Sequence, residues 1–285
     1  MRATLVVLSF AALGCLPAFA QNPRINHGMR VETIRVEAVR QVRENVDLWP
    51  LIVHPKSDGE LRVNAALTRL NKEFVKSLRA CDAGVVEFER GAEKPQDTKD
   101  DLTRSVEVTM RGPRFLSMVA RDEFFCGGAH PDDDLTVLVF DLESGTQVDW
   151  STLVAKSAGA SSAENILGDA GGTRPLILPQ LQIMYVAAED ADADCKGLFE
   201  DKQPIFLWPD AESGTLIAEV ADFPHVAAPC KNELKLTIEQ ARKLGFDESL
   251  LLAIEEAHRV AVARPEAKPA QKQPSAAAAS RPDSH

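Results

Sequence analysis

The fold of this chain is decided by residues 115–150, FLSMVARDEFFCGGAHPDDDLTVLVFDLESGTQVDW. Two strand-like runs frame the stretch, Phe115–Ala120 and Leu135–Asp141, and the second is rich in β-branched residues. The segment between them, Cys126–Asp134, contains two glycines that allow sharp backbone turns and a proline that restricts the residue before it. The chain turns again at Glu143–Gly145. We therefore predict a strand, a loop of glycine, histidine and acids, a second strand and a turn.

A long helix and a further strand are predicted upstream of this stretch. Ser57 and Glu60 have the spacing of a helix capping box. The apolar residues that follow recur at steps of three and four, which predicts a helix over Gly59–Arg79. Ser105–Met110 alternates apolar and polar residues and predicts a strand that precedes the Phe115 strand in an antiparallel meander.

Three more regions complete the predicted fold. Leu178–Leu198 carries an apolar stripe at helical spacing, which predicts a helix. Pro204–Trp208 and Thr215–Val220 flank a turn and predict a hairpin. A capping box beginning at Thr237 predicts a short helix, and Glu248–Val262 predicts another. The predicted fold class is α+β, an antiparallel sheet meander with helices packed on it.

The N-terminus has the pattern of a secretory signal peptide over residues 1–20. Arg2 supplies the positive start, Leu5–Leu16 is an apolar run too short to span a bilayer, and small residues predict cleavage after Ala20. The pattern therefore predicts a periplasmic or secreted protein. The alternative is a lipoprotein anchored through Cys15, which the residues before that cysteine fit less well. No other segment approaches the roughly 20 apolar residues that a spanning helix needs, so no transmembrane helix is predicted.

The exported chain divides by composition and pattern into three parts. Residues 21–114 form an N-terminal α+β part, and residues 115–263 form a second α+β domain. Residues 264–285 consist mostly of Ala, Pro, Lys, Gln and Ser, which is the composition of a disordered tail.

Charge restricts the class of partner. The whole chain has a net charge of −11. Removal of residues 1–20 takes away one arginine and no acid, which leaves 31 Lys and Arg against 43 Asp and Glu, or −12. A surface of this sign argues against nucleic acid and anionic membranes as partners and favours a neutral or cationic partner.

Four cysteines remain after signal cleavage, namely Cys81, Cys126, Cys195 and Cys230. In an oxidising compartment an even number predicts two disulfides, although four cysteines allow three connectivities. We favour Cys81–Cys126 and Cys195–Cys230, because each pair ties neighbouring elements. The cysteines contain no CxxC pair, so a zinc ribbon or a thioredoxin-like site is not predicted.

One motif suggests catalysis. Ala129–Asp133, AHPDD, resembles the signature of zinc-dependent N-acetylglucosaminyl deacetylases, which implies metal binding by a histidine and an aspartate and a second aspartate as general base. His130, Asp132 and Asp133 are the catalytic candidates under this alternative. The chain lacks the HxxH that supplies a further ligand in those enzymes, since no two of its six histidines are three residues apart. We predict neither a bound metal nor a cofactor.

A second resemblance covers most of residues 30–245. Three motifs at this spacing, FCGGAHP at 125–131, FDLESG at 140–145 and WSTL at 150–153, resemble a domain of unknown function. That domain is found in the extracellular part of RsiV-type anti-sigma factors, which sense lysozyme, and beside some peptidoglycan deacetylase domains. A later segment, from DFPH at 222–225 to Cys230, resembles the closing part of the same domain. The resemblance implies an α+β sensing or binding module.

We therefore predict an exported, non-catalytic binding or sensing module of the cell envelope. Its expected ligand is a cell-wall fragment or a cationic wall-lytic protein, and its expected binding residues are Gly127, Gly128, His130 and His225. The alternative is a hydrolase or deacetylase that acts on cell-wall glycan through the Gly-Gly-Ala-His-Pro-Asp loop. The sequence carries no signal for an oligomeric state.

Overall fold

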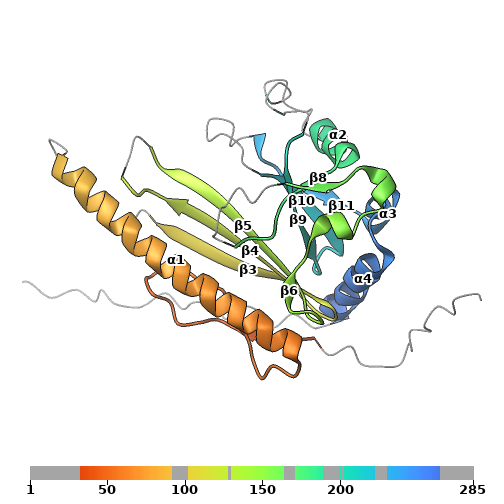
Figure 1. Ribbon diagram of the computed structural model, residues 1–285, viewed down its shortest axis with the longest axis horizontal. Coiled ribbons are helices and arrows are strands. Elements are labelled where there is room, and N and C mark those ends of the chain that lie inside the picture. Colours follow the sequence, from red (N-terminus) through yellow and green to blue (C-terminus); the bar gives the residue numbers. More distant parts are fainter. Residues whose placement is uncertain are drawn as a thin grey trace, which may run out of the picture. The chain divides into compact units, whose positions relative to one another are not determined.

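The computed structural model describes residues 33–91, 102–127, 130–163, 171–188, 195, 199, 202–221 and 230–263 (Figure 1). The signal peptide and the C-terminal tail predicted above lie outside the described residues. Among the described residues, no helix is long and apolar enough to cross a membrane.

The central stretch forms the predicted meander. A four-stranded antiparallel sheet has the order β3 (Thr103–Arg111), β4 (Phe115–Phe124), β5 (Asp132–Asp141) and β6 (Thr146–Gln147). The expected domain boundary after residue 114 falls between β3 and β4, which pair with each other along their length.

The loop between β4 and β5 is shorter than predicted. Asp132, Asp133 and Asp134 belong to β5 rather than to the loop, and they pair with Phe124, Glu123 and Asp122 of β4. The antiparallel ladder continues to the end of β4, and its backbone hydrogen bonds outweigh the low strand propensity of three consecutive aspartates.

A second antiparallel sheet has five strands in the order β11-β10-β9-β8-β7. Its centre is the predicted hairpin, β9 (Ile205–Asp210) and β10 (Thr215–Val220), and this prediction is confirmed. The flanking strands are short: β7 (Ser161–Ser162), β8 (Leu176–Ile177) and β11 (Leu234–Leu236).

Helix α1 (Asp58–Gly91) begins where the capping box predicts and continues twelve residues beyond the predicted end. Ser57 Oγ accepts a hydrogen bond from the Glu60 backbone N–H at 3.1 Å. Beyond Arg79 the buried stripe continues through Cys81 and Val85, so the packing that stabilises the first turns is available to the last ones as well.

The remaining helices are α2 (Pro179–Ala188), α3 (Ile238–Lys243) and α4 (Glu248–Ala263). Both hydrogen bonds of the predicted capping box at α3 are present. Helix α2 ends ten residues before the predicted end, and most of the remaining segment lies outside the described residues. The smaller elements are β1 (Val36–Glu37), β2 (Leu51–Ile52) and the short 3₁₀ helices η1 (Trp150–Thr152) and η2 (Lys156–Ala158).

The β3–β6 sheet separates two hydrophobic cores. One set of β4 and β5 side chains packs on α1, together with Trp49 and Ile52: Leu116, Met118, Ala120, Leu138 and Phe140. The alternate set packs with the second sheet and with α2, α3 and α4: Phe115, Val119, Leu135, Val137 and Val139. Because both faces of β4 and β5 are covered, these strands read as near-continuous apolar runs. Figure 1 shows α1 along one side of this sheet.

Candidate functional site

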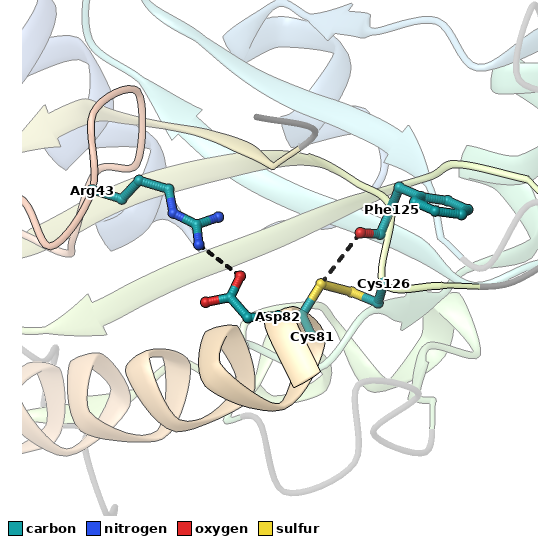
Figure 2. The surroundings of a disulfide bond; sticks show 5 residues. All are labelled: Arg43, Cys81, Asp82, Phe125 and Cys126. Carbon is teal, nitrogen blue, oxygen red and sulfur yellow. Dashed lines mark hydrogen bonds and ion pairs between the residues drawn. A yellow bond between two sulfur atoms is a disulfide. The ribbon is translucent and has the colours of Figure 1, made fainter. Parts of the chain in front are cut away.

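Both favoured disulfides are present, Cys81–Cys126 and Cys195–Cys230. The first joins α1 to the segment that follows β4, with the two Cα atoms 4.4 Å apart (Figure 2). The Cys81 sulfur lies 3.5 Å from the Phe125 carbonyl oxygen. One residue along α1, Asp82 pairs with Arg43 at 2.6 Å. The disulfide and the approach of the Cys81 sulfur to Phe125 fix the start of the predicted glycine–histidine loop on α1, whereas the Asp82–Arg43 pair joins the same turn of α1 to the segment before β2.

The loop also approaches α1 through two glycines. Gly127 has a φ of +82°, and a Cβ at this position would stand 2.7 Å from the Gly84 carbonyl oxygen. Only glycine combines this backbone conformation with so close a contact. The rings of Phe88 and Phe125 meet edge to face at 5.4 Å beside the glycines. The loop is thus anchored by covalent, steric and aromatic contacts.

The catalytic candidates lie at the exposed end of the β4–β5 hairpin. His130 is exposed, with its Nδ1 2.9 Å from the Pro131 carbonyl oxygen. Asp133 accepts a hydrogen bond from Lys231 Nζ at 2.8 Å, and Asp132 Oδ1 accepts one from the Asp133 backbone N–H at 3.0 Å. Within the described ranges, no group of three or more His, Cys, Asp or Glu side chains is placed to hold a metal ion.

Two of the predicted binding residues, Gly128 and His225, lie outside the described residues. The other two, Gly127 and His130, are described and lie on the same loop.

A row of ionic side chains crosses the sheet just behind this loop, and two of the three, Arg104 and Asp122, are buried. Arg104 of β3 pairs with Asp122 of β4 at 2.8 Å, and Asp134 of β5 is the cross-strand partner of Asp122. No sequence motif marks Arg104 or Asp122. The alternation of β3 and β4 places both on the face that packs on α1, but only the strand register brings them opposite each other.

An open cavity of about 400 Å³ lies on the other side of the sheet, where β3 meets β9, β10 and β11. We call it the acidic groove. It is lined by four carboxylates, one lysine, two small polar side chains and two apolar ones: Glu107, Asp210, Glu212, Glu233, Lys235, Thr109, Ser213, Trp208 and Ile217. Trp208 and Ile217 are buried and form an apolar wall of the groove. The glutamates at 107, 212 and 233 are exposed.

Hydrogen bonds of Thr109, through its side chain and its backbone, join the two sheets at the acidic groove. Thr109 Oγ1 donates a hydrogen bond to the Pro209 carbonyl at 2.9 Å, and the Ala211 N–H donates one to the Thr109 carbonyl at 2.8 Å. His258 of α4 contacts the β9–β10 turn: its Nδ1 lies 2.9 Å from the Ala211 carbonyl oxygen, and its ring packs on Gly214. Hydrogen bonds from β3 and α4 to the β9–β10 hairpin therefore hold the acidic groove in shape.

The charges of the acidic groove are only partly balanced. Partial burial raises the pKa of Glu107, and the carboxylates of Asp210, Glu233 and Glu212 raise it further. Arg121 of β4 opposes this effect and pairs with Glu233 at 2.7 Å. Because the carboxylates that line the groove outnumber its one lysine, its electrostatic potential attracts cations.

No sequence motif marks the acidic groove. Its side chains come from β3, from the β9–β10 hairpin and from the segment around β11, and no motif joins these three regions. The available signal was the outward position of Glu107 in an alternating strand together with the acids of the β9–β10 turn.

No family model matches the chain, and no curated protein matches it in sequence. Solved structures that resemble this chain include crystal structures of two DUF3298 family proteins, from a family whose domain has no known function, one from Pseudomonas aeruginosa and one from Bacteroides fragilis. The first is 14% identical, with a TM-score of 0.43 and an alignment that covers 77% of this chain and 97% of the other. The second is 10% identical, with a TM-score of 0.46 and coverage of 78% and 97%. The resemblance to the lysozyme-sensing type of domain stays a prediction.

Proposed function

We propose that this protein is an exported, non-catalytic binding module of the cell envelope, and that its ligand is a cationic wall-lytic protein. The observation that carries the proposal is the acidic groove, in which four carboxylates face one lysine beside apolar wall. The acidic net charge favours a neutral or cationic partner, and the excess of carboxylates in the groove favours a cationic one.

The chemistry of the acidic groove suits a lysine or arginine side chain. The carboxylates of Glu107, Asp210 and Glu233 offer charge-assisted acceptors to an ammonium or guanidinium group. Trp208 and Ile217 offer apolar surface on which the methylene stem of such a side chain can pack. The net charge of −12 after signal cleavage adds long-range steering of a basic partner.

The proposed location rests on two further observations. The N-terminal pattern is that of a signal peptide, and the cysteines left after cleavage form two disulfides. Disulfides of this kind persist in the periplasm or outside the cell and are reduced in the cytosol.

The experiment that tests the proposal is calorimetric titration of the mature protein with a basic lysozyme and with an acidic protein of similar size. We expect binding of the lysozyme alone, and weaker binding as the salt concentration rises from about 0.05 M to about 0.5 M. The double variant E107Q/E233Q should lose at least about tenfold in affinity, because two charge-assisted contacts are removed.

The matched control is E73Q/E87Q, which removes the same charge from exposed positions of α1, on the opposite side of the sheet. An equal loss of affinity in both double variants would show that net charge acts without the acidic groove. Absence of lysozyme binding, with binding of a muropeptide instead, would replace the cationic protein by a wall fragment as the ligand.

A further inference from the structure

The row Arg104–Asp122–Asp134 has the composition of a protonation site. Arg104 Nη1 donates to Asp122 Oδ2 at 2.8 Å, and the two side chains are 4% and 10% exposed. Asp134 lies directly opposite Asp122 on the neighbouring strand and is half-buried. We call these three residues the carboxylate row.

The geometry of the carboxylate row leaves one negative charge in excess and hydrogen-bonding capacity unused. Asp122 Oδ1 and Arg104 Nε are buried without a hydrogen-bond partner among the described residues. The guanidinium carbon of Arg104 is held 4.0 Å from the Phe74 ring centroid and 4.9 Å from that of Trp49. The Arg104 guanidinium is therefore held by the rings of Phe74 and Trp49. It interacts with the carboxylates of both Asp122 and Asp134.

The other charged groups around the carboxylate row do not remove the excess. Asp47, in the segment before β2, adds a further carboxylate near Arg104. Lys231 attracts Asp134 but is itself paired with Asp133 at 2.8 Å, and Asp132 adds another negative charge at the start of β5. On the α1 side, the Arg104 guanidinium lies against the apolar ring of Phe74.

We propose that the carboxylate row is a proton-operated lock: with Asp122 protonated, the end of the β4–β5 hairpin packs more firmly on α1 than with Asp122 ionised. The part of the hairpin concerned is the ladder from Asp122–Asp134 to Phe124–Asp132, which leads directly to Cys126 and Gly127. The lock thus sits behind the loop that the sequence marks as a binding segment, and it is independent of the acidic groove on the other face.

The pH dependence of the lock follows from the difference between the folded and unfolded pKa of Asp122. Burial raises the pKa of Asp122 to about 6 from its ordinary value of 3.8, with Arg104 opposing the rise and Asp134 adding to it. A carboxyl whose folded pKa is raised contributes stability that is fully present below pH 3.8 and is lost as the pH rises through about 6. The hairpin end is therefore packed more tightly in mildly acidic than in neutral solution.

The test is amide hydrogen exchange of the full oxidised protein at about pH 5 and about pH 7.5, corrected for the intrinsic pH dependence of exchange. From a folded pKa of about 6, the opening equilibrium of the hairpin end should rise roughly tenfold between these two pH values. Asp122→Asn should abolish this change, and Asp134→Asn should reduce it. Glu123→Gln, a neutralisation of the exposed neighbour on the same strand, should leave it intact.

Three results would overturn the proposal. The first is wild-type protection of residues 122–124 and 132–134 that is equal at both pH values. The second is a pH dependence that is retained in Asp122→Asn. The third is a change of the same size in β9 and β10, which would mean that Asp122 alters global stability rather than the hairpin end. If Asp122→Asn fails to fold, Asp134→Asn with the Glu123→Gln control decides between the same outcomes.

Discussion

Gly84 of α1 and Gly127 of the loop after β4 lie so close that a Cβ added at Gly127 would stand 2.7 Å from the Gly84 carbonyl oxygen. A Cβ at Gly84 would in turn stand 2.4 Å from the Cys126 carbonyl oxygen. The helix therefore carries a glycine at the turn where the loop backbone crosses it, and the neighbouring Cys81–Cys126 disulfide holds the two backbones together.

This contact makes Gly84→Ala destabilising in spite of the higher helix propensity of alanine. The added methyl group meets backbone, which cannot move aside as a flexible side chain could, so we expect a net loss of about 1–3 kcal/mol in the free energy of unfolding. Gly91→Ala, on the same helix with nothing within 4 Å of the new Cβ, is the control and should be neutral or slightly stabilising. Urea unfolding measures both, and equal stabilities would contradict the close approach.

Removal of the Cys81–Cys126 disulfide should be costly. The bond closes a chain separation of 45 residues, for which loss of chain entropy in the unfolded state gives about 4 kcal/mol. The double variant C81A/C126A should therefore unfold at lower urea concentration. Because C195A/C230A opens a similar separation of 35 residues, we expect a comparable loss there. A loss below about 1 kcal/mol in either variant would argue that the reduced chain retains the same constraint.

Arg121 supports one wall of the acidic groove. It pairs with Glu233 at 2.7 Å and with the buried Glu219 at 3.0 Å, so that Arg121→Met leaves the Glu219 carboxylate without its charged partner. Because the Arg121 side chain is 47% exposed and solvent screens the pair, we expect a moderate loss of about 1–3 kcal/mol. Lys243→Met, which breaks an exposed pair with Glu239, should change stability by less than about 0.5 kcal/mol in the same thermal unfolding assay.

Binding of a cation in the acidic groove should strengthen with pH. The raised pKa of Glu107 keeps this carboxyl partly protonated at pH values where a free glutamate is ionised. As the pH rises from about 4 to about 7, Glu107 gains its charge and the affinity for a basic ligand should rise with it. Titrations of a basic lysozyme into the wild type and E107Q at several pH values test this, and the slope should be smaller in E107Q. Equal slopes would place the titrating group elsewhere.

Export and processing are also testable. The signal peptide pattern predicts that the mature chain begins at Gln21, because Ala18 and Ala20 present the small residues at the cleavage site. N-terminal sequencing or intact mass of the protein from an envelope fraction measures this directly. A lipid-modified chain that begins at Cys15 would support the lipoprotein alternative, and an unprocessed chain in the cytosol would contradict both.

Local spacing was enough to predict several elements correctly. The apolar repeat from Val63 to Leu78 predicts the first five turns of α1, and turn residues between two apolar runs predict the β9–β10 hairpin. The sequence does not predict the end of α1, because its last turns are stabilised by the disulfide and the loop, which are tertiary contacts. The propensity of Asp132–Asp134 predicts a loop, whereas cross-strand pairing makes them part of β5.

By itself the sequence determined the α+β class, the meander, the acidic net charge and the presence of four cysteines for two disulfides. Only the tertiary structure decided which charges meet. Glu107 and Glu233 are 126 residues apart in the chain and line one groove, and Arg104 meets Asp122 only through the β3–β4 register. Periodicity reports which face of its own element a side chain occupies, whereas the partner across that face is set by strand register and by the packing of one sheet on another.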